Sequence, residues 1–294
     1  VIINAIGDRA FCAGGDIADL YASGKKGDFG FGQTFWAEEY RMNALIATYP
    51  KPYIAFMQGF TMGGGVGISC HGSHRIVGES SKIAMPECSI GLVPDVGGSN
   101  ILARAPGYFG EYLGLTAHRM NAGDAIYMGF ADNFIPEHIW PEIIEKLQET
   151  GDISLIERYY TTSPPGTLEM LKDEVSEIFS TSDLAEIVKR LSNKSNNFSE
   201  QSLRAILKHS PLSMACCLSI LGHLRNKQSG LHEALKLEYR FTARSMEYGD
   251  FIEGIRATII EKDRTPNWKF KVTSVPKTAV SLMLNPLGEQ ELSF

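Results

Sequence analysis

The chain has 294 residues, of which 44% are hydrophobic and 21% are charged. This length suffices for one large domain or two, and the composition is ordinary for a globular protein with a sizeable core. The net charge of −6 provides no basic surface for nucleic acid and no polybasic anchor, and no apolar run approaches the roughly 18 residues of a membrane span. The cysteines lack a CxxC spacing and the histidines lack an HExxH motif, so we expect neither a disulfide framework nor a metal site.

The N-terminal residues 1–6 (VIINAI) are a short β-branched run that predicts a buried strand. Residue 1 looks like the middle of this strand and not like its start, so we expect that a segment before residue 1 is missing. Residues 13–15 (AGG) then predict a tight turn that leads into a helix. Because glycine has no Cβ, its backbone N–H can approach a ligand closely. This first turn can therefore supply one amide donor.

A second glycine turn, residues 62–67 (MGGGVG), follows a helix predicted over residues 35–49 and a strand predicted over residues 53–57. A lone run of three glycines is most often a flexible turn. This one continues as a helix start, where unpaired N–H groups and the helix dipole favour negative charge. It matches neither GxGxxG nor GxxxxGK[ST], and Ser69 is not in a GxSxG elbow. Together the two turns predict a pair of amide donors for a developing oxyanion.

Two carboxylates follow the second turn, and each comes directly after a proline. Glu87 ends the extended run 82–86, and Asp95 precedes two further glycines. Taken singly, Glu87 is a surface glutamate by default, and Asp95 is equally well a cap of the helix that follows residue 98. Taken together within a glycine-rich region, they predict a carboxylate pair. One member activates water or attacks a carbonyl, and the other orients or protonates.

The organisation of the chain changes near residue 150. Before this point, short apolar runs alternate with helical stretches, which predicts an α/β layer. After it, apolar residues recur three and four apart in nearly every segment, over residues 168–179, 184–191, 202–208, 212–224 and 231–246. We therefore predict an α/β domain over residues 1–150 and a mainly helical region over residues 151–294.

These motifs resemble the crotonase (enoyl-CoA hydratase/isomerase) superfamily and, within it, the 3-hydroxyisobutyryl-CoA hydrolase branch. The resemblance is carried, in order and at the right spacing, by residues 10–17, 51–67, 85–87 and 91–98, with support from 38–40, 112–116, 250–257 and 263–268. It spans nearly the whole chain, although the middle helices match in pattern only. It implies an α/β fold with a repeated ββα core of stacked sheets and surrounding helices, followed by a mainly helical C-terminal region.

The resemblance also implies roles for particular residues. An acyl-CoA thioester oxygen lies between the backbone N–H groups of Gly15 and Gly64. Glu87 matches the second of the two glutamates that hydratases use, whereas Gly67 stands where the first would be, and Asp95 stands where hydratases generally carry a small residue. This combination resembles the hydrolase branch, in which the substrate is surrounded by Glu39, Gly64, Glu87 and Asp95.

The implied reaction is hydrolysis of a short 3-hydroxyacyl-CoA, of the 3-hydroxyisobutyryl-CoA type that occurs in valine catabolism, to the free acid and CoA. Glu87 attacks the carbonyl or deprotonates water. Asp95 orients Glu87 or passes a proton, and Glu39 accepts a hydrogen bond from the substrate hydroxyl. No cofactor is expected, because coenzyme A is part of the substrate, and neither nucleic acid nor a membrane is expected as a partner.

Three alternatives stay open. The first is a lyase, isomerase or hydratase activity of the same superfamily, and the second is a non-catalytic acyl-CoA-binding protein. The third, a structural module without a ligand, leaves the ordered glycine turns unexplained.

Superfamily members often form trimers or hexamers, so assembly into a homo-oligomer is open too. Bacterial cytoplasm and mitochondrial matrix are both compatible with the sequence.

Overall fold

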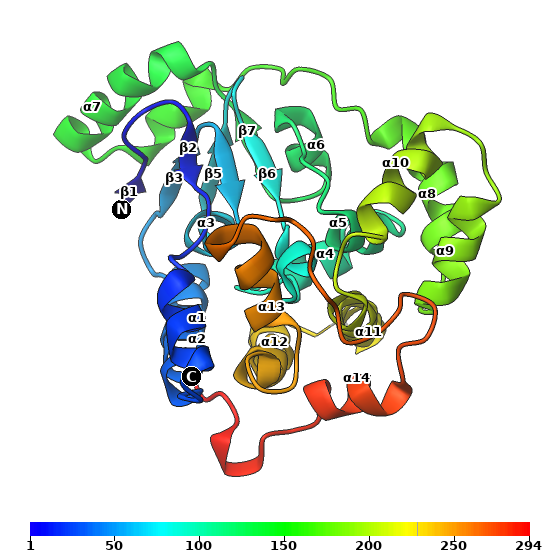
Figure 1. Cartoon of the computed structure of the whole chain (residues 1–294). Coiled ribbons are helices and arrows are strands. Elements are labelled where there is room, and N and C mark those ends of the chain that lie inside the picture. The colour runs from blue at the N-terminus through cyan, green and yellow to red at the C-terminus, as the bar shows by residue number, and fades with distance from the viewer. Residues whose placement is uncertain (228) are drawn as a thin grey trace.

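The structure is a computed structural model that describes residues 1–227 and 229–294 (Figure 1). Two parallel sheets form its N-terminal part. One has the strand order β1-β3-β5-β7, with bounds Ile2–Ile3, Ile54–Met57, His74–Val77 and Asn133–Phe134. The other has the order β2-β4-β6, with bounds Ala10–Cys12, Phe60–Met62 and Lys82–Ala84. All four residues of β3 are buried, as expected for a parallel strand that is covered on both faces.

The two sheets are built by a repeated pattern. A strand of the first sheet is followed by a strand of the second and then by helix. In this way β1 and β2 lead to α1 (Ala18–Lys25) and α2 (Gly30–Ala47), and β3 and β4 lead to α3 (Gly64–Ser69). In the same way β5 and β6 lead to the 3₁₀ turn η1 (Glu87–Ile90) and α4 (Gly98–Arg104). The predicted α/β fold with a repeated ββα core is confirmed.

The buried strand predicted over residues 1–6 is wrong in extent and in burial. Strand β1 covers Ile2–Ile3 only, both residues are half-buried, and Ile6 is fully exposed. The reason is its position, because β1 pairs with β3 alone and lies at the edge of the sheet. The strand that leads into the first glycine turn is β2, whose three residues are too few to give a periodic signal.

Helices make up most of the remaining chain. The N-terminal part continues with α5 (Phe109–Thr116), α6 (Ala122–Tyr127) and α7 (Trp140–Thr150). Every helical segment predicted after residue 168 is present, as α8 (Lys172–Phe179), α9 (Leu184–Ser192), α10 (Asn197–Ile206), α11 (Pro211–Lys227) and α12 (Leu231–Ser245). Two further helices are α13 (Phe251–Ile255) and α14 (Lys277–Leu284). The other 3₁₀ segments are η2 (Glu137–Ile139), η3 (Ile153–Tyr159), η4 (Glu169–Leu171) and η6 (Gly288–Gln290), and η5 (Arg256–Ile260) is a π-helical segment.

The C-terminal helices pack directly on the N-terminal part. Helix α12 lies against α2, α11 against α4 and α5, and α13 against α1 and η1 (Figure 1). One buried core contains side chains from both halves, such as Phe109 and Phe241. The division into two domains at residue 150 stays a prediction. Within the described residues no single helix is long and apolar enough to cross a membrane, and only the bent pair α10–α11 meets that requirement jointly.

Candidate active site

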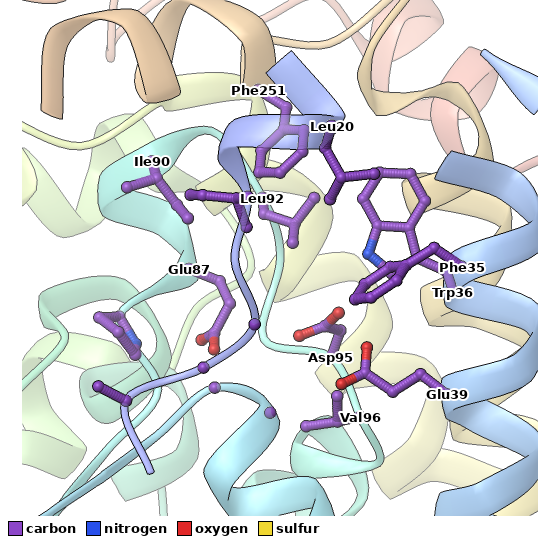
Figure 2. A pocket seen from close by; sticks show the side chains of 17 residues that line it. Leu20, Phe35, Trp36, Glu39, Glu87, Ile90, Leu92, Asp95, Val96 and Phe251 are labelled. Atoms are coloured by element: carbon purple, nitrogen blue, oxygen red, sulfur yellow. The ribbon is translucent and has the colours of Figure 1, made fainter. Parts of the chain in front are cut away.

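A cavity of about 110 Å³ lies where the two glycine turns, α2, η1 and the loop before α4 meet. It is lined by all five residues that the sequence predicts: Gly15, Glu39, Gly64, Glu87 and Asp95. Figure 2 shows the carboxyl groups of Glu39, Glu87 and Asp95 facing the same space, although they come from three different elements. The rest of the wall is mostly apolar and includes Leu20, Phe35, Trp36, Ile90, Leu92, Val96 and Phe251.

The two glycine turns approach each other because small residues permit it. A Cβ at Gly65 would lie 2.3 Å from the carbonyl oxygen of Cys12, so only glycine allows the start of α3 to sit against the end of β2. Gly64 is the first residue of α3, and the backbone N–H of Gly15 lies 3.6 Å from the point where a Gly64 Cβ would be. Within the described residues, neither the Gly15 nor the Gly64 N–H donates to a backbone acceptor. Two amide donors are therefore free at one place.

The same turn passes between two carboxyl groups. A Cβ at Gly63 would lie 3.1 Å from Oε1 of Glu87, and a Cβ at Gly64 would lie 3.0 Å from Oε1 of Glu39. Gly63 also has φ 53°, in the left-handed region where a side chain is strained. Side chains at these positions would push both carboxyl groups away, so the glycines are needed for the carboxyl groups to flank the amides.

Glu87 is only 4% exposed, so the default reading of it as a surface glutamate is wrong. Its backbone begins η1 immediately after Pro86. Both of its carboxyl oxygens are buried, and neither has a hydrogen-bond partner among the described residues. Leaving a buried polar group unpaired costs about 1–3 kcal/mol, and groups left in this state are those for which a functional explanation is needed.

Asp95 does not cap the helix that follows it. The N-cap of α4 is Gly97, which has no side chain to cap the helix. The Asp95 carboxylate instead accepts a 2.7 Å hydrogen bond from the hydroxyl of Tyr40. Both side chains are buried, at 4% and 0% exposure. The capping alternative is therefore wrong, and α2 supplies the partner of Asp95.

The shared cavity changes the acidity of all three carboxyl groups. Burial raises the pKa of Asp95 to about 7, although the Tyr40 hydroxyl lowers it. Burial and then the charge of Asp95 raise the pKa of Glu39 to about 8 and hold the pKa of Glu87 well above its usual range. Asp95 ionises first, because of the three it alone accepts a side-chain hydrogen bond in the described part of the chain. Its charge then opposes ionisation of the other two.

Gly67 lies beside the cavity, at the place where the superfamily resemblance implies the first hydratase glutamate. A Cβ there would lie 2.7 Å from Nδ2 of Asn43 and 2.8 Å from Cβ of Val96. Both neighbours are buried, at 0% and 1% exposure. No side chain fits at residue 67 without displacing one of them. The cavity thus lacks this acid and has no space for it.

Tyr40 and the apolar wall were not predicted as parts of the site. Helical spacing carried a signal for Trp36, which lies three residues before Glu39 on α2, and through Trp36 for Tyr40, which lies four residues after Trp36. The contribution of Phe251 carried no local signal, since α13 reaches the cavity only through tertiary packing. Within residues 1–227 and 229–294, no three His, Cys, Asp or Glu side chains are grouped as a metal site.

Comparison with known proteins gives relatives over the whole chain. Proteins named "3-hydroxyisobutyryl-CoA hydrolase, mitochondrial" from Gallus gallus, Rattus norvegicus and Homo sapiens are 36%, 37% and 35% identical to it. These alignments cover 100% of this chain and 79%, 79% and 78% of the relatives.

Two solved structures that match the whole chain have other names. An enoyl-CoA hydratase from Rhodobacter sphaeroides is 52% identical with a TM-score of 0.96, over 100% of this chain and 86% of that one. A carnitinyl-CoA dehydratase from Mycobacterium thermoresistibile is 34% identical with a TM-score of 0.93, over 100% and 85%. The sequence profile described as enoyl-CoA hydratase/isomerase matches residues 1–284. The chain belongs to the enoyl-CoA hydratase/isomerase family.

Proposed function

We propose that this protein hydrolyses the thioester of a short 3-hydroxyacyl-CoA, of the 3-hydroxyisobutyryl-CoA type, to the free acid and CoA. The observation that carries the proposal is the state of Glu87, which is buried with two unpartnered oxygens beside the turn that bears the Gly64 amide. The names of the hydrolase relatives support the same reaction. It would place the protein in valine catabolism.

The two free amides are assigned to the thioester oxygen. Attack on the carbonyl carbon makes a tetrahedral oxyanion, and the N–H groups of Gly15 and Gly64 stabilise it in a cavity with a mostly apolar wall. Removing one such donor typically costs about 100- to 1,000-fold in rate. Because both donors are backbone groups on fixed turns, they need no reorganisation during the reaction.

Glu87 is assigned as the group that acts on the carbonyl. It either attacks the carbon directly, forming an anhydride that water opens, or removes a proton from the attacking water. Asp95, held by Tyr40, orients Glu87, or it takes up the proton that the attacking water loses and passes it to the leaving thiolate. Glu39 accepts a hydrogen bond from the 3-hydroxyl group, and the cavity admits only the acyl end of the substrate, because drug-sized ligand sites are about 300–1,000 Å³.

Hydration of an enoyl-CoA is the second candidate, because the Rhodobacter sphaeroides structure has that name. The space at Gly67 argues against it, since the acid that hydratases place there has no room. The proposed reaction needs no cofactor. The bacterial cytoplasm and the mitochondrial matrix both stay predictions for the compartment, and the three hydrolase relatives are named as mitochondrial.

The proposal is tested by release of free thiol from 3-hydroxyisobutyryl-CoA, followed with a thiol reagent. The expected result is turnover by the natural protein and loss of turnover in Glu87→Gln. If the natural protein binds the thioester but releases no thiol, it is not a hydrolase of this substrate and the proposal is wrong.

A further inference from the structure

Glu238 is a buried carboxyl group that lies outside the cavity. It is on α12, it is 0% exposed, and it is absent from the cavity lining. One carboxyl oxygen accepts the backbone N–H of Gly97 at 2.8 Å, and the other accepts the backbone N–H of Ser99 at 3.2 Å. The hydroxyl of Ser99 donates to that second oxygen as well. All three donors lie within four residues of Asp95.

The segment that Glu238 holds has an unfavourable backbone conformation. Val96 has φ 52° and Gly97 has φ 79°, so two successive residues are in the left-handed region. A β-branched residue rarely adopts this conformation, and it persists only where the surroundings fix it. Val96 also lines the cavity, so this conformation shapes the wall next to Asp95.

Three side chains from three parts of the chain fix three successive residues of this segment. Tyr40 of α2 donates to the side chain of Asp95, and Nε2 of His71 lies 2.7 Å from the carbonyl oxygen of Val96. Glu238 of α12 accepts from Gly97. Of the three, only Glu238 belongs to the C-terminal helical region.

We propose that Glu238 is a positioning residue, which holds the segment 95–99 so that Asp95 faces Glu87 across the cavity. It acts through the backbone of Gly97 and Ser99 and does not touch the substrate. This inference rests on the proposed function, because it takes Asp95 and Glu87 as the reacting pair. It also gives the C-terminal helices a part in catalysis, since α12 carries the group that fixes the segment.

Glu238 also affects the pair electrostatically. The titratable groups whose charge raises the pKa of Glu87 are Asp95 from the loop before α4, Cys217 from α11 and Glu238 from α12. Glu39 of α2 faces the same cavity. Burial and the charge of Asp95 in turn raise the pKa of Glu238 to about 8. Because Glu87 acts in its ionised form, kcat/KM rises with pH as Glu87 loses its proton. In the pH range where Glu238 is ionised, removing its charge lowers the pKa of Glu87 and moves this rise to lower pH.

The test compares Glu238→Gln with Glu111→Gln. Glu111 is also buried, at 4% exposure, but it pairs with Arg225 and does not line the cavity. With 3-hydroxyisobutyryl-CoA we expect Glu238→Gln to lower kcat roughly 10- to 100-fold with little change in KM, since small misplacements of reacting groups cost about this much. The rise of kcat/KM should move to lower pH in Glu238→Gln and stay in place in Glu111→Gln. Ser99→Ala, which keeps the carboxyl group, should show a smaller loss.

Hydrogen exchange supplies a readout that needs no turnover. The amides of Gly97 and Ser99 should exchange faster in Glu238→Gln than in Glu111→Gln at equal global stability. The inference is wrong if Glu238→Gln has the kcat of the natural protein and an unshifted pH profile of kcat/KM. It is also wrong if Glu238→Gln and Glu111→Gln lose kcat equally and neither shifts this profile. A natural protein that releases no thiol overturns the proposed function instead, and exchange at Gly97 and Ser99 then decides whether Glu238 holds the segment.

Discussion

The hydroxyl of Tyr40 donates a 2.7 Å hydrogen bond to the carboxylate of Asp95, and both side chains are buried. This bond favours the ionised form of Asp95 over that of Glu87, which has no partner for either oxygen. Glu39, the residue before Tyr40, lines the same cavity. One turn of α2 therefore favours the ionised form of Asp95 and also contributes a carboxyl group to the cavity.

The first prediction concerns the carboxylate pair. Glu87→Gln and Asp95→Asn should each lower thioester hydrolysis at least about tenfold, because a positioned acid–base group contributes roughly 100- to 10,000-fold. Initial rates of thiol release, with circular dichroism as a folding check, measure the effect. Glu38→Gln, an exposed carboxyl group next to Glu39, is the control and should keep its rate. Near-natural turnover in both site variants would falsify the assignment.

The second prediction concerns recognition of the 3-hydroxyl group by Glu39. Glu39→Leu keeps a side chain of similar size but removes the hydrogen bond, which is worth about 0.5–1.5 kcal/mol. The preference for 3-hydroxybutyryl-CoA over butyryl-CoA, as a ratio of kcat/KM, should fall about 2- to 10-fold. Glu38→Leu should leave this ratio unchanged. An unchanged ratio in Glu39→Leu would remove Glu39 from substrate recognition.

The third prediction links Glu87 to stability. The folded-state pKa of Glu87 is raised by burial and by Asp95, so its protonated form stabilises the fold below the ordinary pKa near 4.5, and that contribution is lost as pH rises through the folded-state pKa. Glu87→Gln stays neutral at every pH. Its melting temperature should therefore exceed that of the natural protein at pH 8.5, and the difference should shrink at pH 5. Thermal melts of both proteins at the two pH values measure this, and a difference that is equal or larger at pH 5 contradicts it.

The fourth prediction concerns the space at Gly67. Because a Cβ there would overlap Asn43 and Val96, Gly67→Ala should lower the free energy of unfolding by about 1–3 kcal/mol. Gly222→Ala is the matched control. A Cβ at that α11 position meets nothing within 4 Å, so the change should stabilise by about 0.5–1 kcal/mol. Gly67→Glu should likewise be destabilised and gain no hydration of crotonyl-CoA; a stable, hydrating variant would show that the space is available.

Much of the fold was predictable because its signals are local. The apolar run that forms β3 and the amphipathic spacing of α9 and α12 each report burial within one segment. The prediction of a buried strand over residues 1–6 was wrong because an apolar run does not show whether its strand has one neighbouring strand or two. Strand β2 escaped detection since three residues show no period.

The site was predictable only where its parts form motifs. The glycine turns, Glu87 and Asp95 are found within short segments, and the superfamily resemblance assigns their roles. Glu238 and Gly97 are separated by 141 residues and meet only through packing of α12, so nothing near either residue indicates the contact. The raised pKa of Glu87 likewise depends on burial and on neighbouring groups in the assembled fold, and not on the segment that carries Glu87.

The most direct test of the central claim measures two reactions on one sample of the natural protein. Release of thiol from 3-hydroxyisobutyryl-CoA and loss of the enoyl absorbance of crotonyl-CoA are followed in parallel at the same pH. We predict a kcat/KM for thiol release that exceeds that for hydration, because Glu87 lies beside free amides while residue 67 has no acid. Rapid hydration of crotonyl-CoA with little thiol release would contradict the account and favour a hydratase.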